Sequence, residues 1–323
     1  MKSSLAPAAA VVITLSLFSA CSTSPVKPFA TPFEEPERSP AKAKAGAVPE
    51  VSTASSMSGA DMLEFSKWSA VTTPTNGETE IIGTYAAGCL AGAKMLPLES
   101  SNYIVMHPLK RAYFGDASLL KYVTELAARA HEAGLPPLIV EDLSHPRGGP
   151  VAKGHGSHQT GLDVDISFTF ATRVFTALER ETFDSPSYVD DRKNLLPTWT
   201  DAQTKLVSLG ADNENVNRIF VSPAIKKYFC ERYPTAPWLY KLRPWWGHEN
   251  HMHVRLNCPP GSILCRKQAA LSSKQNPCGE DLKWWLSAKA DSEWNSIQAF
   301  WKTGQSKGFP KLPSRCEQVR SAP

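Results

Sequence analysis

Two different periods of apolar and polar residues run through the chain. In DASLLKYVTELAARAHEAG, residues 116–134, apolar residues recur at helical spacing, with Asp116 in front as a capping residue and Gly134 at the end. DVDISF (163–168) and HMHVRL (251–256) instead alternate polar with apolar residues, and this period of two predicts strands with one buried face. The sequence therefore predicts helices together with half-buried strands.

The remaining elements follow from shorter patterns. Two further strands are predicted from their apolar runs, PPLIVEDLS (136–144) and NRIFVS (217–222). Four further helices are predicted at TDAQTKLVSLG (200–210), PAIKKYFCERY (223–233, with Pro223 in its first turn), EDLKWWLSAK (280–289) and SEWNSIQAFWK (292–302). No repeat is visible and strands do not alternate regularly with helices. We therefore expect an α+β fold, with a central, mostly antiparallel sheet and flanking helices.

Residues 1–21 have the features of an export signal. Lys2 supplies the positive start, Leu5–Phe18 the apolar core, and Ser19 and Ala20 the small residues before a cleavage site. The apolar stretch is short for a stable membrane span, and Ser, Thr and Pro follow it. Cys21 is a candidate for acylation in a lipoprotein. In an ordinary secretory signal it would instead be removed on cleavage or have no function. Either way we expect an exported, periplasmic protein, which acylation would anchor to the outer membrane.

Residues 22–77 have the composition of a flexible tether. PVKPFATPFEEPERSPAKAKAGAVPEVSTASS is rich in Pro, Ala, Ser, Thr, Lys and Glu, and it buries too little apolar surface to offset the entropy of ordering. Only ADMLEFSKW (60–68) within it is compatible with a turn of helix. We therefore expect the folded, functional domain to occupy residues 78–318.

Charge and cysteine usage narrow the class of protein. A net charge of +4, with Lys and Arg scattered, argues against nucleic acid as a partner. Setting Cys21 aside, six of the 7 cysteines remain, and an even number in an exported chain predicts disulfides. Six cysteines permit fifteen pairings, of which only Cys258–Cys265 is a local guess. None of them forms a CxxC pair, which disfavours a thiolate zinc site.

Five of the 8 histidines lie in two short windows, KGHGSHQTGLDVDI (153–166) and WWGHENHMHVRL (245–256). Strand alternation places His251 and His253 on one face, and likewise Asp163 and Asp165. Because paired strands lie less than about 5 Å apart, imidazoles and carboxylates could come within coordination reach. Catalytic zinc takes three such protein ligands and keeps one position open. The spacing predicts a metal site, against the alternative of surface loop residues, but it does not choose between Asp163 and Asp165 or between His155 and His158.

These windows resemble a known family. GHGSHQTGLDVDI and HMHVR, together with AAGCLAGAKMLP, RIFVSPAIKKYFC and RPWWGHENHMHVRLNCP, are similar to the penicillin-insensitive murein endopeptidases, over residues 81–316. That family belongs to a larger group of zinc peptidases with lysostaphin-like enzymes and D-Ala-D-Ala peptidases. The resemblance implies a Zn²⁺ cofactor in a surface groove and peptidoglycan as the partner. It also implies hydrolysis of the D-alanyl–meso-diaminopimelyl cross-link by zinc-activated water, with no serine for penicillin to acylate.

The resemblance also assigns individual residues. It implies that His158 and Asp165, in the spacing H-x6-D, and His253, the second histidine of H-x-H, bind the zinc ion. His251 is then the catalytic histidine, beside the metal, which accepts a proton from water and passes it to the leaving amine. His155 and His248 line the cleft, either as donors to the oxyanion or as residues that orient others.

Further assignments concern residues around the site. Asp142, which the resemblance favours over Glu141, is expected to hold a ligand imidazole from behind. The implied disulfides are Cys89–Cys316, Cys230–Cys278 and Cys258–Cys265. Arg147 and Arg255 could bind substrate carboxylates or form structural ion pairs, and Trp245 and Trp246 could wall the groove or pack in the core.

Three alternatives compete with this interpretation. SLLK at Ser118, SSN at Ser100 and KTG at Lys302 imitate the motifs of serine penicillin-binding enzymes, but SSN precedes SLLK, out of that family's order, and SLLK lies within a helical pattern. A zinc D,D- or L,D-carboxypeptidase or dipeptidase acting on stem peptides would use the same site. A non-catalytic wall-binding protein would keep the fold without the chemistry.

Overall fold

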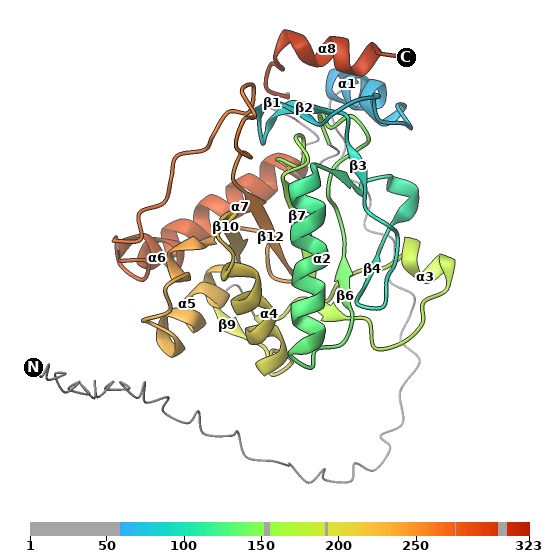
Figure 1. The fold of residues 1–323 in the computed structure, drawn as a ribbon. Helices are drawn as coiled ribbons and strands as arrows, with labels where there is room; N and C mark the ends of the chain where they lie inside the picture. The colour runs from blue at the N-terminus through green and yellow to red at the C-terminus, as the bar shows by residue number, and fades with distance from the viewer. Residues whose placement is uncertain (1–58, 152–155, 191–192, 275, 303–308) are drawn as a thin grey trace, which may run out of the picture. The chain divides into compact units, whose positions relative to one another are not determined.

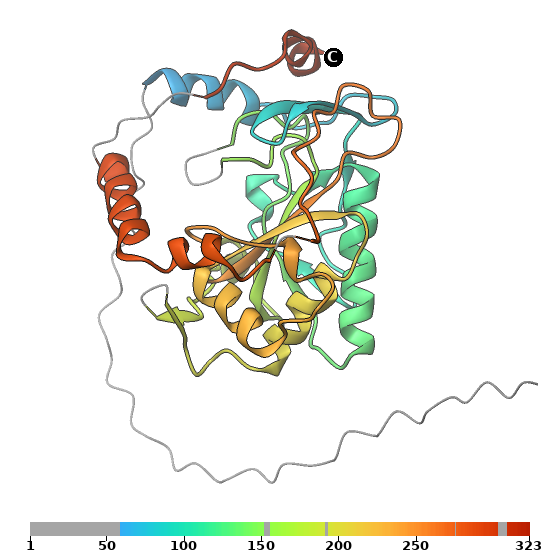
Figure 2. The same cartoon turned by 90° about the vertical axis from the view of Figure 1, so that its left-hand side faces the viewer.

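The computed structural model describes residues 59–151, 156–190, 193–274, 276–302 and 309–323 (Figures 1 and 2). The export signal with Cys21, residues 22–58 of the expected tether, and His155 lie outside the described residues. Among the helices that are described, none is both long enough and apolar enough to cross a membrane.

A six-stranded sheet forms the centre of the fold, in the strand order β11-β10-β12-β7-β6-β4. Its strands are β4 (Tyr103–Val105), β6 (Leu138–Val140), β7 (Asp163–Phe170), β10 (Val216–Val221), β11 (Leu242–Pro244) and β12 (His251–Leu256). The inner pairs β10/β12, β12/β7 and β7/β6 are antiparallel, whereas the outer pairs β10/β11 and β4/β6 are parallel. The α+β class is confirmed, but the sheet is mixed, and the expected antiparallel arrangement describes only its centre.

The two alternating segments became the two central strands. On β7 the apolar residues Val164, Ile166 and Phe168 are fully buried, as are Met252 and Val254 on β12. Helices α2 (Ala117–Glu132) and α4 (Asp201–Ala211) cover this apolar face (Figure 1). Asp116 caps α2 as predicted, because its carboxylate accepts a hydrogen bond from the backbone N–H of Ser118. The polar residues of both strands consequently lie on the opposite face.

The other elements surround this core. The remaining helices are α1 (Gly59–Ser69), α3 (Ala177–Glu181), α5 (Pro223–Arg232), α6 (Glu280–Trp285), α7 (Ala288–Lys302) and α8 (Ser314–Ser321), with 3-10 turns at Pro108–Lys110 and Leu239–Lys241. The short strands are β1 (Glu80–Thr84), β2 (Ala87–Ala91), β3 (Lys94–Met95), β5 (Phe114–Gly115), β8 (Val189–Asp190) and β9 (Asn194–Leu195). The predicted helices are all present. These short strands were not predicted, because two to five residues carry too little pattern.

The boundaries of the folded part differ from the prediction. Within the expected tether, α1 forms a helix of 11 residues, and Trp68 at its end is only 1% exposed. Trp68 packs with Cys89, Cys316 and Val319, and its ring lies where a side chain on Gly149 would have to go. The prediction that residues 22–77 are all tether is therefore wrong for α1. Burial of one tryptophan fixes this helix although the segment around it has a polar composition.

The C-terminus is fixed in the same region. The buried guanidinium of Arg147 donates hydrogen bonds to the carbonyls of Thr73, Val319 and Ala322, so the folded part continues beyond residue 318. Figures 1 and 2 show α1, α8 and the β1–β2 hairpin close together on one side of the fold. Arg147 therefore has a structural role rather than a role in binding substrate carboxylates.

Three disulfides crosslink the described part of the chain. They are Cys89–Cys316, Cys230–Cys278 and Cys258–Cys265, the three pairs that the family resemblance implied. Cys89–Cys316 links residues 227 positions apart and so attaches α8 to β2. Such crosslinks are typical of proteins that fold in an oxidising compartment outside the cytosol.

Candidate metal centre

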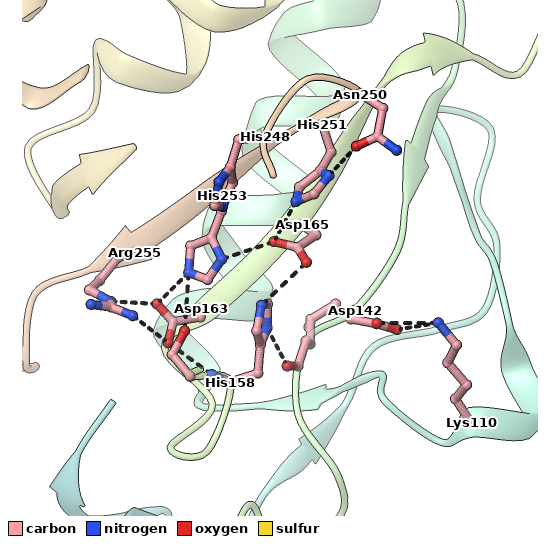
Figure 3. Close-up of polar contacts among 12 residues, drawn as sticks. Lys110, Asp142, His158, Asp163, Asp165, His248, Asn250, His251, His253 and Arg255 are labelled. Carbon is pink, nitrogen blue, oxygen red and sulfur yellow. Dashed lines mark hydrogen bonds and ion pairs between the residues drawn. The ribbon is translucent and has the colours of Figure 1, made fainter. Parts of the chain in front are cut away.

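Two imidazoles and a carboxylate meet on the polar face of the central sheet (Figure 3). Asp165 on β7 and His253 on β12 are directly opposite each other in the antiparallel register, and His158 reaches them from the loop before β7. One possible ligand atom from each residue lies within 4.8 Å of the other two, and all three residues are buried. The structure therefore brings together the three residues for which the resemblance implies metal binding.

The backbone around His158 determines which ring nitrogen faces this cluster. His158 has a left-handed conformation, with φ 66°, which is uncommon for a residue other than glycine. Its Nδ1–H donates to the carbonyl of Leu143 at 2.8 Å, and its backbone N–H donates to Asp163 Oδ2 at 3.2 Å. Nε2 consequently points toward Asp165 Oδ2, at 3.3 Å. A buried imidazole that is held by its other nitrogen is the usual arrangement of a metal ligand.

His253 is oriented by an ion pair behind it. Its Nε2 lies 3.1 Å from Asp163 Oδ1, and Arg255 Nε donates to the same oxygen at 2.7 Å. Because Asp163 can only accept a hydrogen bond, Nε2 carries the proton, and Nδ1 faces Asp165 Oδ1 at 3.1 Å. Arg255 therefore forms a structural ion pair instead of binding substrate. The position of Asp163 opposite Arg255 also separates its role from that of Asp165.

The charge balance of the cluster favours a cation. Burial alone would raise the pKa of Asp165, but the neighbouring imidazole of His158 holds it well below its usual range. Burial would likewise raise the pKa of Asp163, but Arg255 and His253 hold it low. Two ionised carboxylates are therefore buried among imidazoles. A His–Asp–His set of this kind fits Zn²⁺, which takes three protein ligands in catalytic sites.

Two more histidines line the same region. His251 Nε2 lies 3.7 Å from Asp165 Oδ1, and the rings of His248 and His251 are 5.1 Å apart between centroids. His248 Nδ1 faces the carbonyl of Trp246 at 2.8 Å. Burial is the main cause that lowers the pKa of both His248 and His251, so both imidazoles are neutral near pH 7. With its Nδ1–H donated to Trp246, neutral His248 offers a lone pair at Nε2, and it can accept a proton or hydrogen bond there but cannot donate one.

Asn250 holds His251 in a defined orientation, which the sequence did not suggest. Asn250 Nδ2 donates to the carbonyl of Ser185 at 3.0 Å, so its side-chain oxygen must point the other way. That oxygen lies 2.6 Å from His251 Nδ1, which is therefore the protonated nitrogen of the neutral ring. Nε2 of His251 then carries the lone pair and faces the metal cluster (Figure 3).

The carboxylates after β6 have other partners than expected. Asp142 accepts a hydrogen bond from Lys110 Nζ at 3.3 Å, while the carbonyl of Leu143 accepts the one from His158 Nδ1. The group that fixes the orientation of the His158 ring is thus a backbone carbonyl. Glu141 accepts from Ser185 Oγ at 2.9 Å, and its pKa is raised to about 7, mainly by burial.

Trp246 and the serine motif have structural roles, whereas Trp245 is partly open to solvent. Trp246 packs against Trp285, with ring centroids 4.7 Å apart, and stacks on Trp294 at 5.8 Å, whereas Trp245 remains 47% exposed. Ser118 bonds to the capping residue Asp116 in the first turn of α2, which removes the basis for a serine nucleophile there.

Comparisons with other proteins agree with this geometry. A sequence profile described as penicillin-insensitive murein endopeptidase matches residues 81–321. Proteins of that name resemble the chain over most of its length. One from Klebsiella pneumoniae is 34% identical over 268 residues, covering 81% of this chain and 94% of its own. One from Salmonella arizonae is 38% identical over 263 residues (80% and 92%), and one from Yersinia pestis is 37% identical over 258 residues (78% and 89%).

Proposed function

The chain belongs to the penicillin-insensitive murein endopeptidase family, and from that premise we propose that it hydrolyses the D-alanyl–meso-diaminopimelyl amide that cross-links peptidoglycan. The observation that carries this proposal is the convergence of His158, Asp165 and His253 on one buried point. A metal-dependent hydrolase forms no acyl-enzyme on a serine, which accounts for insensitivity to penicillin.

The metal is proposed to be Zn²⁺, held by Nε2 of His158, the carboxylate of Asp165 and Nδ1 of His253. When bound, zinc supplies Lewis-acid polarisation of a carbonyl and lowers the pKa of water from about 15.7 to about 7. Asp163 and the Leu143 carbonyl keep the two imidazoles in the tautomers that such binding requires. No HExxH glutamate is present to act as base, so another side chain has to move the proton.

His251 is proposed to move that proton. Its Nε2 carries the lone pair because Nδ1–H is bonded to Asn250, and burial keeps the ring neutral near pH 7. It can therefore accept a proton from the attacking water and pass it to the leaving amine, a task suited to imidazole. His248 is proposed to accept a hydrogen bond from water or from the leaving amine at its own Nε2, since its Nδ1 donates to Trp246. His155 is proposed as a further histidine of the cleft.

Export to the periplasm is proposed together with this function. The three disulfides fit an oxidising compartment, and peptidoglycan lies there. Acylation of Cys21 would add attachment to the outer membrane. Metabolic labelling with a fatty acid, compared between the wild-type chain and Cys21→Ala, tests that attachment.

Digestion of purified peptidoglycan sacculi tests the proposed function. The zinc-loaded protein should convert cross-linked muropeptide dimers into monomers, as judged by mass analysis of the fragments. Treatment with a chelator should abolish this conversion, and added Zn²⁺ should restore it.

Each alternative gives a different product pattern in the same digestion. Release of single terminal residues from monomers, with the dimers intact, would favour a carboxypeptidase. Dimers that survive the zinc-loaded protein would favour a wall-binding protein. Unchanged digestion after chelation would contradict the metal site.

Substitution of Asn250 tests how His251 is positioned. Asn250→Ala removes the side-chain oxygen that accepts a hydrogen bond from His251 Nδ1. This change should lower kcat about tenfold, the effect of losing roughly one hydrogen bond. The zinc content and KM should stay unchanged, because Asn250 contacts neither of the proposed histidine ligands through an observed hydrogen bond. Asn250→Asp keeps an acceptor at this position and should retain most of the activity. Equal losses in Asn250→Ala and Asn250→Asp would show that the acceptor has no such role.

A further inference from the structure

A cavity of about 420 Å³ opens beside the metal cluster. His158 and Leu143 line it at the cluster, and Phe65 and Ser69 of α1 line it on another side. Lys110 and Arg111 also belong to its wall. Figure 3 shows Asp142 between His158 and Lys110, on the side of His158 that faces away from His253. A group bound in this cavity would therefore lie next to the bond at which the metal centre acts.

Part of the lining is apolar. Phe65, Leu109, Ala112, Leu143 and Val151 supply aliphatic and aromatic surface. Leu109 is 77% exposed, which places it toward solvent, whereas Leu143 is fully buried. The ring of Phe65 lies 6.2 Å from that of His145, and burial is the main cause that lowers the pKa of His145, so that this side of the wall is uncharged. The cavity can accordingly hold a hydrocarbon chain.

The charged part of the lining carries excess positive charge. Lys110 and Arg111 supply two positive charges, and Asp142 supplies one carboxylate, whose oxygen lies 3.3 Å from Lys110 Nζ. The Lys110 side chain is 48% exposed, so its ammonium remains accessible to a second anion. Arg111 uses an Nη2 donor on the carbonyl of Ser69 at 3.0 Å, which ties the guanidinium to α1. Arg147 and Arg255, the two arginines considered from the sequence, are both committed to structural contacts.

The α1 side of this wall precedes the region that the family profile matches. The family match begins at residue 81, whereas α1 ends at Ser69. Phe65 and Ser69 therefore come from the segment before residue 81, where the profile match starts. Trp68, buried against Gly149, holds α1 in place on the loop that leads to His158. This arrangement gives the helix a role in shaping the cleft as well as in packing.

We propose that this cavity is a specificity subsite for the acidic residue beside the cleaved amide, an inference that rests on the proposed function. The ligand class is an amino acid with an aliphatic stem and a carboxylate that forms no peptide bond. Its stem packs on Phe65 and Leu109, and its carboxylate pairs with Lys110 and Arg111. A volume of about 420 Å³ lies near the lower end of small-ligand sites, about 300–1,000 Å³, and suits one such residue rather than a glycan strand.

Two cross-linked peptides that differ in one group test this subsite. One carries the free carboxylate on the residue beside the scissile amide, and the other carries the primary amide there. The ratio of their kcat/KM values is measured with the zinc-loaded, full-length protein. The wild-type protein should prefer the free acid about tenfold or more, as expected for a charge-assisted hydrogen bond. Lys110→Gln should bring the ratio close to one, and the conservative Lys110→Arg should preserve most of the preference.

A matched control and a second variant complete the test. Lys121, which pairs with Glu125 on the surface of α2, gives the control variant Lys121→Gln, whose ratio should equal that of the wild type. Phe65→Ala should raise KM several-fold for both peptides and leave kcat nearly unchanged. An unchanged ratio in Lys110→Gln would overturn the charge pairing, and an unchanged KM in Phe65→Ala would remove α1 from the subsite.

Failure of the proposed function would look different. If the zinc-loaded wild type cleaved neither peptide, the endopeptidase proposal would fall. Calorimetry of the two peptides with the wild type and with Lys110→Gln would then still show whether the cavity binds the free carboxylate. Tighter binding of the free acid, lost in Lys110→Gln, supports the subsite, and equal binding of acid and amide refutes it.

Discussion

His158→Ala should lose both the bound metal and the hydrolytic activity, with kcat at least about 10³-fold lower. The residue is buried, its Nδ1 is bonded to the carbonyl of Leu143, and its Nε2 lies 3.3 Å from the carboxylate of Asp165. Alanine leaves only one imidazole and one carboxylate for the ion, and zinc in catalytic sites takes three protein ligands. The metal content by mass spectrometry and the digestion of sacculi measure the two losses separately.

Two controls make this experiment decisive. His131→Ala removes an exposed histidine from the last turn of α2, and it should keep both metal and activity. Thermal unfolding of the metal-free proteins should show that His158→Ala still folds cooperatively. If folded His158→Ala retained zinc and cleaved dimers at the wild-type rate, the assignment of His158 as a ligand would be wrong.

The central part of this site was predictable because alternate residues of a strand point to opposite faces, so the buried apolar residues determine where the polar residues lie. Val164 and Ile166 on β7 are fully buried, which fixes Asp163 and Asp165 on the other face. The same period on β12 fixes His251 and His253. Because β7 and β12 are neighbours in the sheet, their polar faces coincide.

The sequence pattern could not predict the register or the backbone contacts. A shift of the register by two residues would place Arg255 opposite Asp165 on the same face, so alternation alone cannot separate Asp163 from Asp165. The hydrogen bond that orients His158 is donated by its Nδ1–H to the backbone carbonyl of Leu143, and the type of a residue does not show where its carbonyl will point. Asp142, the residue type that the sequence did offer, accepts a hydrogen bond from Lys110.

The role of α1 was missed for another physical reason. The composition of residues 22–77 averages over a long polar segment, whereas the docking of α1 depends mainly on Trp68. That tryptophan fits because Gly149 has no side chain, a complementarity between residues 81 positions apart that composition cannot report.

His251→Ala should lower kcat by about 10²- to 10⁴-fold, the usual contribution of a general acid or base, while the metal content stays at the wild-type level. His251 Nε2 lies beside Asp165, but the close cluster of possible ligand atoms is made by His158, Asp165 and His253. Loss of the rate without loss of the metal therefore distinguishes a proton carrier from a ligand. A variant that lost zinc together with activity would instead make His251 part of the metal centre.

The pH profile provides an independent measure of the same role. Burial lowers the pKa of His251 below its ordinary value of about 6.5, so the ring is neutral and able to accept a proton at neutral pH. The wild-type kcat/KM, which reports the free enzyme, should therefore fall only when the pH drops below the usual range of imidazole, as Nε2 becomes protonated. In His251→Ala the residual rate should lack this acid limb, because the group that titrates is gone. An acid limb that persisted unchanged in His251→Ala would assign the titration to another group, and the proton would then have to move through His248 or His155.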